Sequence, residues 1–100
     1  MPEIPPEFRP ALRRELDALI AGERPELMVW VREYGESGAQ LVPQPESIWA
    51  HPSAEFGARS DGSCFGVVPL WTRSESPSDL SAEFEIDIEG IARLTDVRVL

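Results

Sequence analysis

The sequence has no lysine and no asparagine, only one cysteine, and no long apolar run. The single cysteine, Cys64, cannot form an internal disulfide, which favours a reducing compartment. No segment approaches the ~20 apolar residues of a membrane span. Residues 1–7 also lack the basic and apolar regions of a secretion signal. We therefore expect a cytoplasmic protein with no membrane partner.

Positive charge is also scarce. Nine arginines stand against eighteen acidic residues, which gives a net charge of −9. Nucleic acids and anionic membranes are bound mainly through basic side chains, so this charge disfavours both as partners. It is compatible with a basic protein partner, although it also serves simply to keep a small protein soluble.

Catalytic and cofactor-binding motifs are missing as well. The sequence contains no phosphate-binding glycine loop, no G-x-S-x-G nucleophile motif and no zinc or calcium loop. Cys64, His51 and Asp61 are the residue types of a nucleophilic triad, but no nucleophile motif surrounds Cys64, which lies in an apolar segment. One histidine and one cysteine do not complete a zinc shell. We predict no catalytic residue, no metal and no cofactor.

The residues that are present indicate one domain over residues 1–100, in which residues 1–7 form a flexible arm. Apolar residues make up 42% of the chain and include three tryptophans. A chain of this length and composition buries enough surface to fold without metals or disulfides.

Two helices are expected first. The first runs from Arg9 or Pro10 to Ala21 and ends at Gly22. The second begins at Pro25 and ends at Gly35. Each has an apolar stripe at helical spacing. The stripes consist of Phe8, Leu12, Leu16, Leu19 and Ile20, and of Leu27, Trp30, Val31 and Tyr34.

The middle of the chain is less regular. Residues 40–42 predict a short strand, residues 46–50 one helical turn with Ile48 and Trp49 inward, and residues 51–62 a loop. Residues 63–72 read as a strand that is apolar on both faces, with Phe65 and Val67 on one side and Cys64 and Val68 on the other. Pro69 lacks an amide proton and indicates an edge or a bulge there.

The most regular pattern covers residues 80–89, where apolar and polar residues alternate, as in a strand with one face on the core. The expected inward residues are Leu80, Ala82, Phe84, Ile86 and Ile88. A last strand follows over residues 92–99, with a bulge at Thr95 and Asp96 where the alternation slips. The fold class is therefore α+β: two N-terminal helices packed on one face of a three- to four-stranded antiparallel meander.

The outward residues of this strand form an acidic row, Glu83, Glu85, Asp87 and Glu89. Such a row is a candidate docking surface for a basic partner. The alternative interpretation is a solvated face that is neutralised by cross-strand arginines such as Arg93 and Arg98.

Aromatic residues suggest a second candidate site. Trp30, Tyr34, Trp49 and Trp71 are the expected lining of a pocket between helices and sheet, with His51 and Asp61 at its mouth. The alternative is that these aromatic side chains are ordinary core residues.

Several segments resemble a family of small bacterial domains of unknown function. The resemblance rests on Pro69-Leu70-Trp71-Thr72 followed by Ser78-Asp79-Leu80, on Arg32-Glu33-Tyr34-Gly35, on Leu41-Val42-Pro43 with Pro45, and on Val97-Arg98-Val99-Leu100. It covers the chain from Arg32 onward and implies no catalytic residue. The order of elements is also similar to a reduced NTF2-like or cystatin-like fold.

Three functional hypotheses follow. The first is a non-enzymatic bacterial accessory or protein-interaction domain that uses its acidic sheet face, with immunity proteins as one instance. The second is an NTF2-like pocket protein that binds or converts a small molecule. The third is a homodimeric structural domain. The sequence leaves open whether the protein is a monomer or a homodimer.

Overall fold

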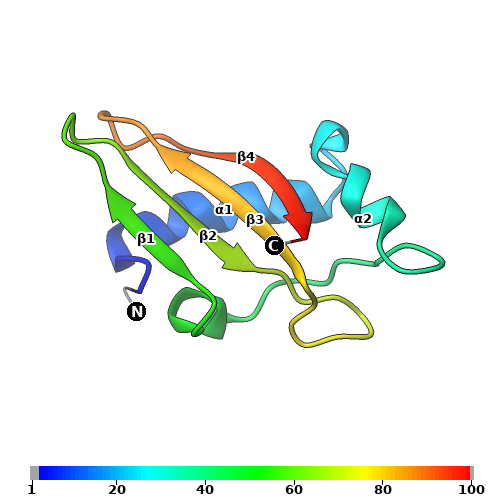
Figure 1. Ribbon diagram of the computed structural model, residues 1–100. Coiled ribbons are helices and arrows are strands. Elements are labelled where there is room, and N and C mark those ends of the chain that lie inside the picture. The colour runs from blue at the N-terminus through cyan, green and yellow to red at the C-terminus, as the bar shows by residue number, and fades with distance from the viewer. Residues whose placement is uncertain (1–2, 100) are drawn as a thin grey trace.

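A four-stranded antiparallel sheet with one long helix across its back organises the protein (Figure 1). The computed structural model describes residues 3–99. The strands are β1 (Glu55–Ala58), β2 (Cys64–Pro69), β3 (Leu80–Ile86) and β4 (Ala92–Val99), and they lie in the sheet in chain order. The α+β fold class and the antiparallel meander are confirmed.

The helix behind the sheet is α1 (Arg9–Ile20), which follows a 3₁₀ turn, η1 (Pro6–Phe8). Leu12, Leu16 and Leu19 are buried on the stripe that faces the sheet. Gly22, at φ 84°, ends the helix as expected, because a left-handed residue lets the next amide return to the helix: Glu23 N donates to Ala18 O at 2.9 Å.

The N-terminal segment is packed against this core. Ile4 is fully buried, and its amide donates to the carbonyl oxygen of Trp49 at 3.0 Å. Of the arm expected over residues 1–7, residues 1 and 2 lie outside the described part of the chain. The remainder runs beside α1 and the turn η3 (Glu46–Ala50), where Ile48 and Trp49 are buried as predicted.

The second helix is shorter than the sequence indicates. A 3₁₀ turn, η2 (Pro25–Leu27), and a five-residue helix, α2 (Val29–Glu33), are separated at Met28. The break rotates the following residues, so that Val31 is buried whereas Trp30 is 50% exposed and not part of the inward stripe. Figure 1 shows α2 beside the C-terminal end of β4, at the margin of the sheet.

Two expectations for the middle of the chain are wrong. Residues 40–42 make a single bridge, Leu41 to Thr72, because Pro43 and Pro45 prevent a longer ladder. The segment predicted as loop, 51–62, contains β1. The sequence does not indicate this strand, because Glu55-Phe56-Gly57-Ala58 has neither sustained alternation nor a β-branched residue.

The register of β3 sets the core. Leu80, Ala82, Phe84 and Ile86 are buried on the helix side, and Phe84 lies between Gly66 and Leu94 of the neighbouring strands. Gly66 is required there, because a β-carbon would overlap the carbonyl oxygen of Glu55 and the ring of Phe84. The predicted inward position of Ile88 is wrong: β3 ends at Ile86, and Ile88 is 70% exposed in the following turn.

The irregular positions of the sheet agree with the sequence. Glu83 pairs with Asp96 and Phe84 with Leu94, so Thr95 is the extra residue of the expected bulge. Pro69 is the last residue of β2. The amide of the next residue, Leu70 N, donates to Leu80 O on the β3 side. Because successive backbone nitrogens point to opposite sides of a strand, the ring nitrogen of Pro69 points toward β1. That strand begins at Glu55, opposite Val67, so no amide proton is needed at Pro69.

Candidate functional site

The face of the sheet opposite α1 is covered by no element of residues 3–99 (Figure 1). We call this surface the open face. Cross-strand pairing assigns its residues, since side chains alternate between faces and paired residues share one. They are Glu55 and Gly57 on β1, Phe65, Val67 and Pro69 on β2, Ser81, Glu83 and Glu85 on β3, and Arg93, Asp96 and Arg98 on β4.

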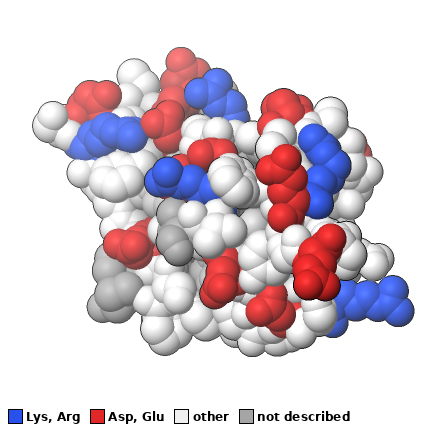
Figure 2. Space-filling model, turned by 45° about the vertical axis from the view of Figure 1, so that its right-hand side comes forward, with Lys and Arg blue, Asp and Glu red and all other residues white. Residues whose placement is uncertain are grey.

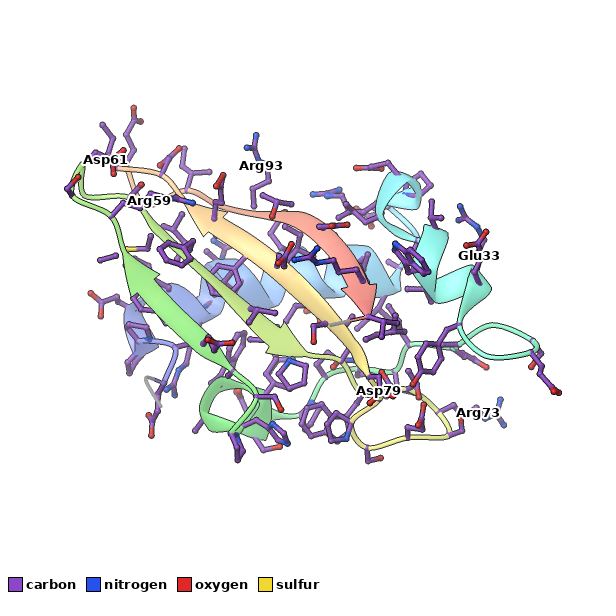
Figure 3. The ribbon with its side chains drawn as sticks, viewed as in Figure 1. Glu33, Arg59, Asp61, Arg73, Asp79 and Arg93 are labelled. Carbon is purple, nitrogen blue, oxygen red and sulfur yellow. The ribbon has the colours of Figure 1, made fainter. Side chains whose placement is uncertain are left out.

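Two members of the predicted acidic row lie on the open face, and both are ion-paired. Arg98 Nη2 donates to Glu83 Oε2 at 2.9 Å, and Arg59 Nη2 donates to Glu85 Oε2 at 3.0 Å. Arg93 lies opposite Glu85 in register, but in Figure 3 it points away from the sheet. Figure 2 shows basic side chains lying beside acidic ones on the surface, as these ion pairs require.

The other two members of the row do not lie on a strand. Asp87 follows the end of β3, and its Oδ1 accepts from Glu89 N at 2.9 Å and from Ile91 N at 3.0 Å. Asp87 therefore shapes the β3–β4 turn. Glu89 is exposed in the same turn.

A different acidic row runs across the strands. Glu55 pairs with Val67, Val67 with Glu83, and Glu83 with Asp96, so three carboxylates and one valine lie in line over four strands. We call these four residues the cross-strand row. Glu55 makes no ion pair with the described residues. No sequence pattern indicates this row, because the sequence predicts a loop where β1 lies and Glu55 cannot be placed without that strand.

Phe65 stands beside the cross-strand row and is 43% exposed. Its ring leans over Gly57 of β1, where a β-carbon would come within 2.7 Å of Cζ. The Arg59 guanidinium lies 4.8 Å from the ring centre, which is cation–π distance. In front of Val67, the ring borders a hollow of about 390 Å³ that is rimmed by Glu55 and Glu83.

A smaller hollow of about 220 Å³ lies at the far end of the sheet, between the β1–β2 and β3–β4 turns. Arg59, Ser63, Glu85 and Arg93 line it. Arg59 and Glu85 are already bonded to each other there, whereas Arg93 makes no ion pair with the described residues.

The six residues of the predicted aromatic pocket are dispersed over the molecule. Trp30 is half exposed on α2. Trp49 is 2% exposed beside α1, with the Arg13 guanidinium 5.2 Å from its ring centre. Its indole nitrogen donates to Glu46 Oε2 at 2.6 Å, and this bond, assisted by Arg13, lowers the pKa of Glu46 below its ordinary value.

Tyr34, Trp71 and His51 lie near the loop that joins β2 to β3. The Tyr34 hydroxyl donates to Glu75 Oε1 at 2.7 Å and accepts from Asp79 N at 3.1 Å. The bond from the Asp79 amide is the largest single influence and lowers the Tyr34 pKa, but the bond to Glu75, desolvation of the hydroxyl and the negative charges of Glu75 and Asp79 together raise the pKa above its ordinary value. Trp71 makes an edge-to-face contact with His51, with ring centres 5.5 Å apart.

Asp61 lies in the β1–β2 turn, away from these rings (Figure 3). Its Oδ1 accepts from the hydroxyl and the amide of Ser63 at 2.6 and 2.8 Å, and these bonds lower the pKa of Asp61. Trp49 borders a separate hollow with Pro6, Arg9 and Glu46.

Cys64 lies on the helix side of β2 and is 9% exposed, in line with Ala58 and Ile86. Among residues 3–99, no three His, Cys, Asp or Glu side chains are grouped so as to hold a metal ion. No helix in that range is long and apolar enough to cross a membrane.

Comparison with known proteins gives one match. The model of a family described as "Domain of unknown function (DUF7668)" matches residues 9–100, and the chain belongs to this family. The match agrees with the expected small domain of unknown function and extends to α1. No curated protein and no solved structure matches the chain.

Proposed function

We propose that this family member is a non-enzymatic protein-interaction domain whose open face meets a partner through basic residues of that partner. The observation that carries the proposal is the cross-strand row. It places the carboxylates of Glu55, Glu83 and Asp96 on the uncovered side of the sheet, next to the half-exposed ring of Phe65. Proteins that neutralise a basic toxin are one instance of such a domain.

The charge of the open face is divided rather than uniform. The three carboxylates of the cross-strand row have one cationic neighbour on the open face, Arg98. Nearer the β1–β2 turn the balance is reversed, because the single carboxylate of Glu85 lies beside two arginines, Arg59 and Arg93. The proposal therefore concerns the cross-strand row, and Glu85, Asp87 and Glu89 are not its centre. A net charge of −9 adds long-range attraction for a basic partner, which speeds encounter more than it strengthens the final complex.

Phe65 adds a feature that a merely solvated face does not need. Exposed aromatic rings beside polar groups are enriched at the centres of protein interfaces, where they supply much of the binding energy. On this chain the ring is held in place by Gly57 and Arg59, so little side-chain freedom is lost when a partner covers it.

Partner capture with paired charge reversals tests the proposal. Tagged protein is incubated with lysate of the source organism, washed at low and at high salt, and compared with Glu55→Arg/Glu83→Arg and with Asp17→Arg/Glu23→Arg. Both double variants change the net charge equally, but Asp17 and Glu23 are exposed positions of α1 and the turn after it.

We expect a basic protein that the wild type and the α1-side variant retain at low salt and release as salt rises. The Glu55→Arg/Glu83→Arg variant should not retain it. Equal capture by the two double variants, or no capture by the wild type, contradicts the proposal.

A further inference from the structure

The chain contains an example of how its open face holds a guanidinium group. Arg59 lies over the ring of Phe65 at 4.8 Å, and its Nη2 donates to Glu85 Oε2 at 3.0 Å. An aromatic face and a carboxylate together are what a guanidinium prefers, since it is planar, weakly hydrated and forked. Figure 3 shows Arg59 extending from the β1–β2 hairpin across the front of the sheet.

A second combination of an aromatic ring and a carboxylate lies two residues along the strands, on the side of Phe65 away from the β1–β2 turn. The hollow of about 390 Å³ borders the same Phe65 ring. Its carboxylate on β3 is Glu83, which takes the place that Glu85 has at Arg59, because the two residues share a face of the strand. Val67, 8% exposed, forms an apolar floor.

The hollow has acceptors on two sides. Glu55 lies across it from Glu83, since both pair with Val67. Among the described residues, Glu55 side-chain oxygens accept no hydrogen bond, and at Glu83 only Oε2 is used, by Arg98. Two strand spacings, about 9.6 Å, separate the glutamate backbones. Side chains of this length can close that distance around a guanidinium.

We propose that this hollow anchors one arginine side chain of the partner. The inference rests on the proposed function and specifies its central contact. The arginine stem lies over Val67, the guanidinium packs against the free side of Phe65, and its N–H groups donate to Glu55 and to Glu83 Oε1. Arginine fits better than lysine, because an ammonium group neither stacks on the ring nor bridges two carboxylates with fixed geometry.

Titration with defined peptides tests the anchor without an identified partner. The probes are an eight-residue peptide of alternating arginine and glycine, the same peptide with lysine, and the same peptide with citrulline, a neutral analogue of arginine. Binding is followed by amide chemical shifts of isotope-labelled protein at low salt. We expect shifts centred on residues 55–57, 65–67 and 83, with the lysine form about fivefold weaker and the citrulline form at least tenfold weaker.

Three single variants locate the contact. Glu55→Gln and Phe65→Leu should each weaken the arginine peptide about fivefold. Glu89→Gln is the control, because it removes the same charge from an exposed position in the β3–β4 turn and should leave affinity unchanged. Native chemical shifts away from the substitution establish that each variant is folded.

The outcomes separate this inference from the proposed function. Equal weakening by Glu55→Gln and Glu89→Gln, or equal affinity for the arginine and citrulline peptides, overturns the anchor. If partner capture is nevertheless lost in Glu55→Arg/Glu83→Arg, the interaction surface stands and only the anchor fails. If the peptide shifts no open-face residue and capture is unaffected by the reversals, both fail.

Discussion

Gln44 shows how much of this fold depends on single polar side chains in loops. It is 5% exposed, and its amide nitrogen donates to the carbonyl oxygens of Val42 and Trp71 at 2.6 and 3.0 Å. Its Oε1 accepts from Trp71 N at 2.7 Å. Gln44 thus adds side-chain bonds to the backbone bridge that joins two segments of the family resemblance, around Leu41 and Trp71. A polar residue in an aperiodic segment gives no pattern, so the sequence did not predict this contact.

Substituting Gln44 tests this role. Gln44→Ala leaves the partly buried amide of Trp71 without its side-chain partner, and it should lower the free energy of unfolding by about 1–3 kcal/mol. Gln40→Ala is the control, because Gln40 is exposed and its side chain makes one long contact, 3.5 Å, with Arg73. Urea unfolding of both variants gives the comparison. A loss as small for Gln44→Ala as for Gln40→Ala would show that another group or water takes over these bonds.

At the scale of secondary structure, the elements with strict periodicity could be predicted and those without it could not. The stripe of α1 and the alternation of β3 each reflect burial on one side, so their faces follow from the sequence. β1 is only four residues long and contains Gly57, and its pairing with β2 makes it a strand. The ends of elements were also hard to place. The apolar alternation continues to Ile88, but Asp87 bonds to its own turn and ends β3.

Edges of the sheet are a further property that periodicity does not reveal. Along β4, Glu15 Oε1 of α1 accepts from Leu94 N at 3.3 Å, and Asp96 Oδ1 accepts from Val97 N at 2.9 Å. With the bulge at Thr95, these acceptors occupy amides that would otherwise be available to another strand. These contacts disfavour the pairing of a further strand with β4 at Leu94 and Val97.

Paired alanine substitutions in and after β3 test where the strand ends. Phe84→Ala removes a ring that is 1% exposed and should cost about 3–5 kcal/mol of unfolding free energy. Ile88→Ala, at a position 70% exposed, should cost less than about 0.5 kcal/mol. Urea melts of the two variants measure the difference. A large loss at Ile88 would mean that β3 continues into the core as the alternation indicates.

For the whole molecule, two charge effects oppose each other as the pH falls. Protonation of carboxylates reduces the net charge of −9 and with it the self-repulsion of the folded chain. It also removes native bonds at Glu46 and Asp61, whose pKa values are lowered by hydrogen bonds from Trp49 and Ser63. Self-repulsion is screened by salt, whereas these hydrogen bonds are not, so salt separates the two effects.

The pH dependence of stability at high salt is the prediction that follows for Glu46. Its folded pKa lies below the ordinary 4.5, so its contribution is complete above pH 4.5 and is lost as the pH falls through the lowered folded pKa. Wild-type protein should therefore lose stability in urea melts at high salt as the pH falls below 4.5, and Glu46→Gln should lose less. Glu26→Gln, the control, removes a charge of the same sign from an exposed position that makes no ion pair with the described residues, and it should follow the wild type. If Glu46→Gln and wild type have the same slope, the bond from Trp49 does not stabilise the carboxylate. Arg13 would then hold this turn through packing of its guanidinium over the Trp49 ring and through its bond to the carbonyl oxygen of Gln44.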